Sequence, residues 1–332
     1  MRYVIYGAGA IGGVIGGKLF QAGHEVVLIA RGAHYEAVAA RGLRLETPGA
    51  AVTLPVPVVP APADVGFRES DVVILAVKSQ DTPAALQALA RTAPSRTAVV
   101  CAQNGVANEP AALRMFPNVY GMCVMLGATH LTPGVVQARS APVSGLLDIG
   151  RWPAGSDHIA GQIAADLSAA TFSSEVRDDI PRWKWGKLLR NLANAVDALC
   201  GPRARTGEIA IRAREEGIAC LQKAGIPYSG PDEDRARREA IFAATPPADG
   251  IPRGAGTSSS WQSLARNAGT IETDYLNGEI VLLGRLHDIP TPVNQLLQTA
   301  AARTAREHRA PGTFPEHDLL AMLSSRQNMP LP

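Results

Sequence analysis

The feature that most constrains this chain is a glycine-rich turn that directly follows its first apolar run. Tyr3–Tyr6 is a β-branched and aromatic segment typical of a strand, and Ala10–Ala22 is a small, apolar, proline-free segment typical of a helix. Between them the chain reads Gly7-Ala8-Gly9-Ala10-Ile11-Gly12, which matches the pattern G-x-G-x-x-G. In this strand-to-helix setting the pattern predicts a turn that binds a dinucleotide, with a plain structural glycine turn as the alternative.

Each part of this turn has a physical task in the predicted site. Gly7 permits a tight turn, Gly9 lets the backbone approach a pyrophosphate, and Gly12 lets the helix pack closely against the strand. The N–H groups at the start of a helix lack partners inside the helix, so they are available to phosphate oxygens. We therefore expect the whole turn, including Ala8, Ala10 and Ile11, to contact the cofactor.

The first half of the chain alternates apolar runs with helix-like segments. Glu25–Ala30, Asp71–Val77 and Ala98–Ala102 contain continuous apolar runs, which are typical of strands buried on both faces. Such strands separated by helices predict a parallel sheet covered on both sides. Leu43–Pro60 is expected to form an excursion at the edge of this sheet, and Val119–Gly150 to form strands joined by turns.

The pattern changes near residue 178, after the last expected strand, Thr171–Arg177. From there on the periodicity is helical. The predicted fold class is therefore α/β, with an N-terminal Rossmann-type parallel sheet domain at residues 1–178 and an all-helical C-terminal domain at residues 179–332. A stretch rich in proline and glycine, Thr245–Gly256, predicts a mobile loop in the second domain.

Charge and composition exclude several classes of function. The 32 basic and 30 acidic residues give a net charge of +2, which leaves no electrostatic footprint for nucleic acid or an anionic membrane surface. No apolar run approaches the ~20 residues that span a bilayer, and the start does not read as a secretion signal, so we expect a cytoplasmic protein. The four cysteines form no C-x-x-C pair and the histidines no H-x-x-x-H pair, so we expect reduced thiols and no bound metal.

The residue that follows the second strand indicates which dinucleotide binds. An NAD enzyme usually carries an acidic residue there, which binds the ribose 2′-hydroxyl. This chain has Arg31 instead, and a guanidinium pairs well with a 2′-phosphate, so we predict NADP(H). A solvated arginine at the end of a strand is the alternative.

Two further polar residues directly follow strands of the predicted sheet. Lys78 follows Asp71–Val77, and Asn104 follows Ala98–Ala102. Ligands of open α/β sheets bind outside the carboxyl ends of the strands, so both side chains are suitably placed to face cofactor or substrate. For Asn104, which precedes a glycine, a plain turn is the alternative.

A polar stripe runs along the predicted helix Ile180–Leu199. Lys187, Asn191 and Asn194 have the spacing i, i+4, i+7 and lie beside an apolar stripe. Asparagine is a poor helix former, because its amide competes for backbone hydrogen bonds. Its repeated use beside a lysine indicates a hydrogen-bonded site, and an exposed polar face is an equally weighted alternative.

A second candidate lies in the predicted helix Gly269–Leu286. Glu272 shares an apolar face with Leu276, Leu283 and Leu286, and a carboxylate in such a place needs a partner or a function. Because Glu279 lies on the same face, a surface helix is the alternative. The serine cluster that ends at Ser260 could cap a helix or bind a substrate carboxylate.

Taken together, these motifs resemble the ketopantoate reductase (2-dehydropantoate 2-reductase) family over essentially the whole chain. The most specific of them is E-x-D-Y-x-N-G, which begins at Glu272, twelve residues after Ser260. The other motifs that carry the resemblance are the glycine turn, Arg31, Lys78, Asn104-Gly105, Trp185-x-Lys187-Leu188, Asn191 and Ser258–Ser260.

The resemblance implies reduction of ketopantoate to pantoate with NADPH, a step of pantothenate and coenzyme A biosynthesis. Lys187 would be the general acid for the ketone oxygen while hydride reaches C2, and Glu272 would bind the substrate hydroxyl and position Lys187. Ser260 would bind the substrate carboxylate, and Asn191 would contact the substrate. Asn104 would help to align substrate and nicotinamide, with Lys78 beside it. The implied partner is a small 2-oxo acid, and a homodimer is compatible with the sequence.

One position departs from the family pattern. Members often carry asparagine eight residues after the lysine, where this chain has Ala195, and Asn194 stands one residue earlier. One residue is a rotation of about 100° along a helix. Asn194 remains a candidate for substrate binding, and a paralogous reductase of another 2-oxo acid is the alternative function. A non-catalytic NADP(H)-sensing protein is a third possibility, against which the presence of Lys187 and Glu272 argues.

Overall fold

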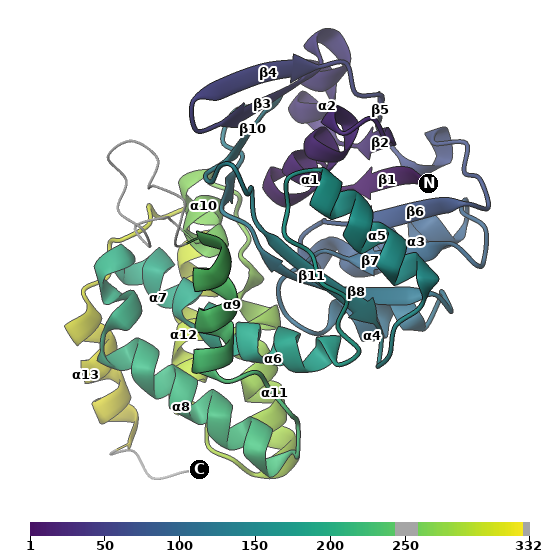
Figure 1. The fold of residues 1–332 in the computed structure, drawn as a ribbon. Helices are drawn as coiled ribbons and strands as arrows, with labels where there is room; N and C mark the ends of the chain where they lie inside the picture. Colours follow the sequence, from purple (N-terminus) through teal and green to yellow (C-terminus); the bar gives the residue numbers. More distant parts are fainter. Residues whose placement is uncertain (243–257, 328–332) are drawn as a thin grey trace. The chain divides into compact units, whose positions relative to one another are not determined.

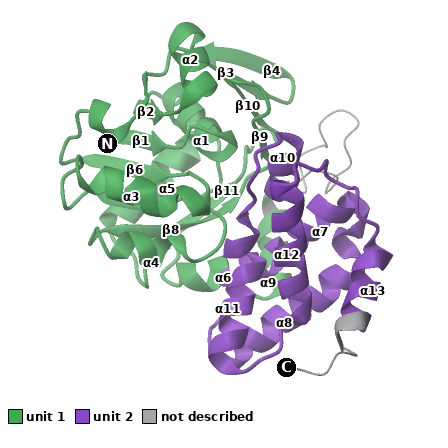
Figure 2. Ribbon diagram, turned by 180° about the vertical axis from the view of Figure 1, so that it is seen from behind, with its two compact units in different colours: residues 1–184, 230–251 green, residues 185–229, 252–332 purple. Residues whose placement is uncertain are grey.

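The computed structural model describes residues 1–242 and 258–327 of the chain. The described residues fall into two compact units, residues 1–184 with 230–242 and residues 185–229 with 258–327 (Figure 2). The expected loop Thr245–Gly256 lies outside the described residues.

The first unit is built on a seven-stranded sheet with the strand order β11-β8-β7-β6-β1-β2-β5 (Figure 1). All neighbouring strands are parallel except β11, which runs antiparallel to β8. The predicted Rossmann-type parallel sheet is thereby confirmed, with one antiparallel strand at its edge. The strands are β1 (Arg2–Tyr6), β2 (Glu25–Ile29), β5 (Val58–Val59), β6 (Asp71–Leu75), β7 (Ala98–Cys101), β8 (Val119–Met125) and β11 (Leu146–Arg151).

Helices cover both faces of this sheet, because alternate residues of each apolar strand point to opposite sides. Tyr3 and Ile5 of β1 belong to a core with residues of α1 and α5, whereas Val4 belongs to a second core with residues of α3 and α4. Because both faces of the sheet are covered by helices, the strands are continuous apolar runs in the sequence. The helices of this unit up to residue 169 are α1 (Ala10–Gln21), α2 (Gly32–Arg41), α3 (Thr82–Ala90), α4 (Asn108–Leu113) and α5 (His158–Ala169), with the short 3-10 helices η1 (Pro62–Asp64) and η2 (Ser79–Asp81).

A second, four-stranded sheet joins two segments that are far apart in the sequence. Its order is β4-β3-β10-β9, and β10 (Val135–Ala138) pairs in parallel with β3 (Leu43–Thr47). The expected edge excursion is thus part of a separate sheet, completed by β4 (Ala50–Leu54) and β9 (Ala128–Thr129). This sheet packs against α1: a Cβ added at Gly13 would lie 2.6 Å from Cγ1 of Val136.

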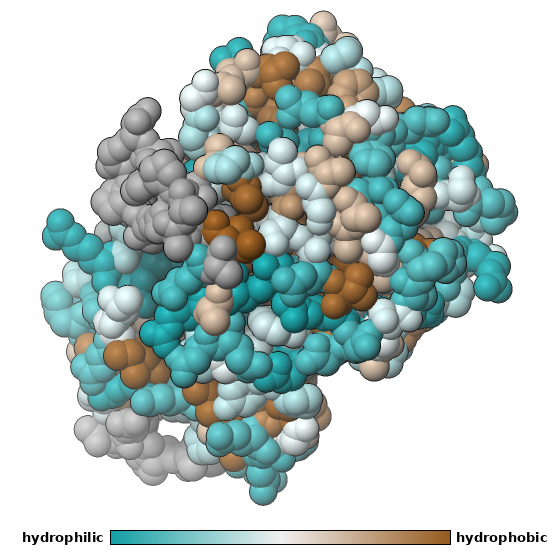
Figure 3. Space-filling model, in the orientation of Figure 1, coloured by the Kyte–Doolittle hydropathy of each residue, from teal (hydrophilic) through white to brown (hydrophobic). Residues whose placement is uncertain are grey.

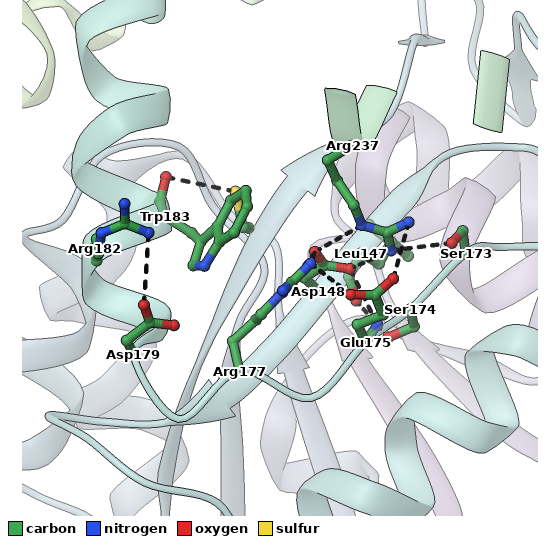
Figure 4. Close-up of polar contacts among 11 residues, drawn as sticks. Leu147, Asp148, Ser173, Ser174, Glu175, Arg177, Asp179, Arg182, Trp183 and Arg237 are labelled. Carbon is green, nitrogen blue, oxygen red and sulfur yellow. Dashed lines mark hydrogen bonds and ion pairs between the residues drawn. The ribbon is translucent and has the colours of Figure 1, made fainter. Parts of the chain in front are cut away.

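The segment expected as the last strand, Thr171–Arg177, is not a regular strand. It makes only isolated bridges to β11, from Ser173 to Leu146 and from Val176 to Ile149. Ser173 of this segment and Asp148 of β11 bind α9 (Pro231–Phe242): the guanidinium of Arg237 donates hydrogen bonds to Asp148 at 2.7 and 3.1 Å and to Ser173 at 3.0 Å (Figure 4). This buried charge pairing explains why α9 belongs to the first unit, although it follows residue 178.

The second unit is helical throughout its described residues. The contacts divide the two units after Lys184, inside α6 (Ile180–Asn191), rather than at residue 178. The remaining elements are α7 (Ala193–Cys200), η3 (Pro202–Thr206), α8 (Glu208–Lys223), α10 (Ser259–Ala265), η4 (Glu272–Tyr275), α11 (Asn277–His287), α12 (Pro292–Arg306) and α13 (Glu316–Gln327).

Several expected absences can be examined in the described residues. None of their helices has the length and apolar character needed to cross a membrane. Within the same ranges, no group of three or more histidine, cysteine, aspartate or glutamate side chains could hold a metal ion. None of the four cysteines, all of which lie in these ranges, forms a disulfide bond. The face shown in Figure 3 is largely hydrophilic, with apolar residues in small separate groups.

Candidate functional site

The glycine turn connects β1 to α1 and is fixed by the neighbouring strands. The N–H groups of Gly7 and Ala8 both donate to the carbonyl oxygen of Ile29, at 3.1 and 3.2 Å. Gly7 has φ +102°, and a Cβ there would lie 2.7 Å from the backbone nitrogen of Val77. Only glycine fits this position without strain, because both the backbone conformation and the space exclude a side chain.

The other two glycines shape the space in front of α1. At Gly12 a Cβ would lie 2.2 Å from the carbonyl oxygen of Gly7 and 2.9 Å from Cγ2 of Ile5, so this glycine lets the helix approach the strand. At Gly9, the residue before α1, a Cβ would meet nothing within 4 Å. The helix therefore begins at Ala10 beside open space, where its first N–H groups can bind an anion. These features fit a dinucleotide pyrophosphate.

Arg31 stands where β2 ends and α2 begins, and its side chain is largely exposed. Its guanidinium lies 3.5 Å from the carboxylate of Asp81, which follows β6 and is itself 45% exposed. An exposed ion pair of this kind contributes about 0–1 kcal/mol, so Arg31 can exchange it for a phosphate at little cost.

Lys78 and Asn104 lie at the ends of the next strands. Lys78 precedes η2 directly after β6, and Asn104 follows β7, and both side chains are partly buried. Because β7, β6, β1 and β2 are consecutive in the sheet, the glycine turn, Arg31, Lys78 and Asn104 share one carboxyl edge. The structure therefore places together the predicted site residues of the first unit, and their roles remain predictions.

A buried polar network supports this edge. The side-chain amide of Gln103 donates to the carbonyl oxygen of Val77 and to the hydroxyl of Thr82, each at 2.8 Å. Thr82 donates to Asn108 at 2.8 Å, and Asn108 donates to the carbonyl oxygen of Asn104 at 3.2 Å. The turns that carry Lys78 and Asn104 are thus bound to each other. Sequence reasoning missed these residues, which carry no motif of their own.

The predicted helix Ile180–Leu199 is divided in the structure. α6 ends at Asn191 and α7 begins at Ala193, and the carbonyl oxygen of Leu192 accepts a hydrogen bond of 3.2 Å from the side chain of Asn277. The carbonyl oxygen at the junction of the two helices therefore has a partner from a third helix. Lys187 and Asn191 lie on α6, and Asn194 lies on α7.

The three members of the polar stripe have different surroundings. Lys187 is partly buried. Asn191 is also partly buried, and its side-chain nitrogen has no hydrogen-bond partner in the described part of the chain. The side-chain oxygen of Asn194, by contrast, accepts a hydrogen bond of 3.3 Å from Arg205, and its residue is 6% exposed. Asn191 is therefore the asparagine with an unused buried donor, which is a group expected to find a ligand or water.

The serine cluster contains one cap, Ser258, and two hydroxyls without a hydrogen-bond partner in the described residues, those of Ser259 and Ser260. Ser258 caps α10, because its hydroxyl accepts a hydrogen bond of 3.1 Å from the N–H of Trp261. Ser260 is 1% exposed, and its hydroxyl has no hydrogen-bond partner among residues 1–242 and 258–327. The capping alternative thus applies to Ser258, and Ser260 keeps a hydroxyl available for a ligand.

Glu272 does not lie on the helix that the sequence predicted. η4 ends at Tyr275 and α11 begins at Asn277, so the chain changes direction at Leu276. Leu286 is 66% exposed and does not share a buried face with Glu272, which is 4% exposed. Burial lowers the pKa of the Arg266 guanidinium, and the carboxylate of Glu272 opposes this effect.

Asn277, in the same motif, has a structural partner on each side. Besides its bond to Leu192, its amide donates to the side-chain oxygen of Asn294 at 3.0 Å, and Asn294 in turn donates to Glu216 at 2.8 Å. Burial raises the pKa of Glu216, against the hydrogen bonds that it accepts from the start of α12. This network connects the junction of α6 and α7 to α8, α11 and α12.

Two family models match this chain. The model described as "Ketopantoate reductase PanE/ApbA" matches residues 3–154, and the model described as "Ketopantoate reductase PanE/ApbA C terminal" matches residues 179–304. The 2-dehydropantoate 2-reductase of Halobacterium salinarum is 30% identical over 311 residues, which cover 90% of this chain and 96% of the relative. That of Pyrococcus horikoshii is 29% identical over 307 residues, covering 90% and 95%.

Solved structures show the same fold. A PanE/ApbA family ketopantoate reductase from Ralstonia eutropha JMP134 has a TM-score of 0.76 and 31% identity, covering 93% of this chain and 99% of that chain. A D-mandelate dehydrogenase, solved with NADH and anilino(oxo)acetate, has a TM-score of 0.79 at 24% identity, with the same coverage. Such similarity establishes the architecture and leaves open which 2-oxo acid and which nicotinamide dinucleotide this chain uses.

Proposed function

Because this chain belongs to the ketopantoate reductase family, we propose that it reduces a 2-oxo acid to a 2-hydroxy acid with NADPH, with ketopantoate as the first candidate substrate and pantoate as its product. The observation that carries the proposal is the shared carboxyl edge of β7, β6, β1 and β2. There the glycine turn, Arg31, Lys78 and Asn104 meet. Without the open space at Gly9 and the free start of α1, the edge would offer no place for a pyrophosphate.

The choice of NADPH over NADH rests on the end of β2. Arg31 follows this strand, and no carboxylate occupies the position that would bind a ribose 2′-hydroxyl. Asp81 lies 3.5 Å from the guanidinium, so a bound 2′-phosphate would compete with this carboxylate for Arg31. We infer that the phosphate prevails, because a guanidinium binds phosphate through a two-pronged, charge-assisted contact.

The bound dinucleotide supplies a hydride, and the chain supplies the proton that completes the reduction. The ammonium of Lys187 donates a proton to the ketone oxygen of the substrate as C2 becomes a secondary alcohol carbon, and it regains a proton from water. Before the transfer is complete, the same cation stabilises the negative charge that develops on the oxygen. Glu272, which is 4% exposed, accepts a hydrogen bond from the substrate hydroxyl and keeps Lys187 in place.

The substrate carboxylate and the polar groups near C2 need donors, and two buried groups in the second unit are available. The hydroxyl of Ser260 and the amide nitrogen of Asn191 have no hydrogen-bond partner in the described residues. We assign Ser260 to the carboxylate and Asn191 to the hydroxyl or carbonyl side of the substrate. We also assign Asn104 to alignment of the substrate.

A second candidate function is the reduction of another 2-oxo acid, and one observation favours it. Ala195 is fully buried, where family members often carry asparagine, and the side-chain oxygen of Asn194 is bound to Arg205. The second amide contact of the family pattern is therefore missing at this position. A substrate that needs one amide fewer than ketopantoate would fit this arrangement.

The test is NADPH oxidation, followed by absorbance, with a panel of 2-oxo acids led by ketopantoate. Preferred turnover of ketopantoate supports the first candidate, and preferred turnover of another 2-oxo acid supports the second. If the protein binds NADPH but turns over no 2-oxo acid, the proposal is wrong and the protein is a nucleotide-binding protein without this activity.

A further inference from the structure

A buried ion pair lies next to the turn that carries Asn104. The ammonium of Lys184 in α6 contacts the carboxylate of Glu109 in α4, and the two side chains are 2% and 0% exposed. The ammonium also donates to the carbonyl oxygens of Gln103, at 3.0 Å, and Met122, at 3.4 Å. The buried ammonium thus has one carboxylate and two carbonyl oxygens as neighbours.

Stability alone does not account for such a pair. Removing two charges from water carries a large desolvation penalty, and well-packed apolar residues of similar volume often serve as well or better. Burial raises the pKa of Glu109, and the ammonium opposes this effect. Apart from Lys184, no donor of another described residue reaches either carboxylate oxygen of Glu109. The pair is therefore best explained by the arrangement that it enforces.

That arrangement concerns the chain from Gln103 to Glu109. At one end Lys184 holds the carbonyl oxygen of Gln103, the residue immediately before Asn104. At the other end it holds the side chain of Glu109, and the neighbouring Asn108 donates to the carbonyl oxygen of Asn104 at 3.2 Å. A single ammonium therefore fixes both ends of the turn that carries Asn104, and Asn104 is the residue that we assign to the substrate.

The sheet makes room for this lysine. A Cβ added at Gly121 of β8 would lie 3.3 Å from Cδ of Lys184, so the lysine stem packs directly against the strand. In α6, Lys184 lies between Ile180 and Leu188, both nearly fully buried, at the spacing i±4. A lysine in the middle of an apolar stripe is the sequence signal that could have identified this residue.

We propose that Lys184 and Glu109 are positioning residues for Asn104, which hold its turn so that its amide meets the substrate at the carboxyl edge of β7. The inference rests on the proposed function, because that function gives Asn104 its role. Lys184 also anchors the N-terminal half of α6, and Lys187 follows three residues later on the same helix. The pair touches no reacting atom, so its effect on the rate passes through these two residues.

The experiment compares two apolar replacements of buried ion pairs. The test variant is Lys184→Met with Glu109→Leu, and the matched control is Arg2→Met with Asp71→Leu. Arg2 and Asp71 form an ion pair of 2.6 Å at the opposite, amino ends of β1 and β6. For the test variant we expect kcat to fall by about 10- to 100-fold, as for a misplaced catalytic group. Its NADPH affinity, measured by fluorescence, and the kcat of the control should stay within about twofold of wild type.

A double-mutant cycle with Asn104→Ala separates positioning from a general structural effect. If the pair acts through Asn104, adding Asn104→Ala to the test variant causes little further loss of kcat. Losses that multiply independently would overturn the proposal, as would an unchanged kcat in the test variant. Glu109→Gln keeps the shape of the side chain and one acceptor for Lys184 but removes the opposite charge, so its kcat should fall by less than that of the test variant. If the double replacement does not fold, this variant carries the test, and a kcat equal to that of the wild type overturns the proposal.

Hydrogen–deuterium exchange of the peptide covering residues 102–108 tests the same idea without turnover. Its amides should exchange faster in the test variant than in the control, because the turn has lost its anchor. Unchanged exchange overturns the proposal whether or not any substrate is found. Failure of the wild-type protein to reduce any 2-oxo acid would instead refute the proposed function, and exchange would still decide whether the pair holds the turn.

Discussion

His34 makes the glycine turn sensitive to acid. The residue lies in α2, and its Nδ1 accepts a hydrogen bond of 2.9 Å from the N–H of Gly134. Since Nδ1 is an acceptor, the proton of the neutral ring lies on Nε2, which donates to the carbonyl oxygen of Ala8 at 2.7 Å. The ring also packs against His130, with 4.3 Å between centroids. His34 thus binds the glycine turn to the start of β10.

Protonation of His34 is unfavourable in the folded protein. Burial, with a smaller contribution from His130, lowers the pKa of His34 from 6.5 to about 4. As the pH falls, the unfolded chain takes up this proton first, so the stability that the neutral ring provides is complete above pH 6.5 and is lost toward about pH 4. With 1.36 kcal/mol for each pH unit and allowance for partial exposure, the loss between pH 7 and pH 4.5 is about 2 kcal/mol.

The perturbation is His34→Gln, which keeps a donor for Ala8 and cannot be protonated. We expect the free energy of unfolding of the wild type to fall relative to this variant by about 2 kcal/mol between pH 7 and pH 4.5, measured by urea denaturation. His317→Gln is the matched control, because the His317 side chain is 82% exposed. A constant difference between wild type and His34→Gln over this range would refute the reasoning, as would an NMR titration that places the pKa of His34 near 6.5.

Three further substitutions test individual parts of the account. Lys187→Ala should lower kcat by at least about 100-fold while NADPH still binds, and a near-normal rate would remove Lys187 as the general acid. Arg31→Ala should weaken NADPH binding by about 10- to 100-fold and leave NADH binding nearly unchanged, and equal losses measured by fluorescence titration would exclude Arg31 from 2′-phosphate recognition. Gly12→Val should abolish nucleotide binding and destabilise the first unit by several kcal/mol, because its Cβ would lie 2.2 Å from a backbone oxygen. A variant that binds the nucleotide and has normal stability in thermal unfolding would contradict the packing described for α1.

Local sequence patterns were sufficient to predict the parts of the fold that depend on neighbouring residues. The glycine turn between Tyr3–Tyr6 and Ala10–Ala22 follows from three glycines at fixed spacing, and the parallel sheet follows from its continuous apolar strands. The carboxyl edge that gathers Arg31, Lys78 and Asn104 follows in turn from the parallel order of the strands.

The features that the sequence did not reveal depend on contacts between distant residues. β3 pairs with β10, about ninety residues later, so the small sheet has no local signature. At the junction of α6 and α7, the carbonyl oxygen of Leu192 is bound by the side chain of Asn277, 85 residues later. The role of Lys184 likewise becomes visible only when Glu109 is placed beside it. Hydrophobic periodicity shows that a helix is present, and it does not show which distant amide or carboxylate will interrupt or anchor it.

The central claim is that hydride passes from NADPH to C2 of a 2-oxo acid in this protein. The most direct measurement uses NADPH that carries deuterium at both C4 positions of the nicotinamide, with ketopantoate as the first acid, and mass spectrometry of the product. The account predicts a 2-hydroxy acid with one deuterium at C2, formed faster with NADPH than with NADH. A product without deuterium, or no product from any 2-oxo acid of the panel, would contradict it.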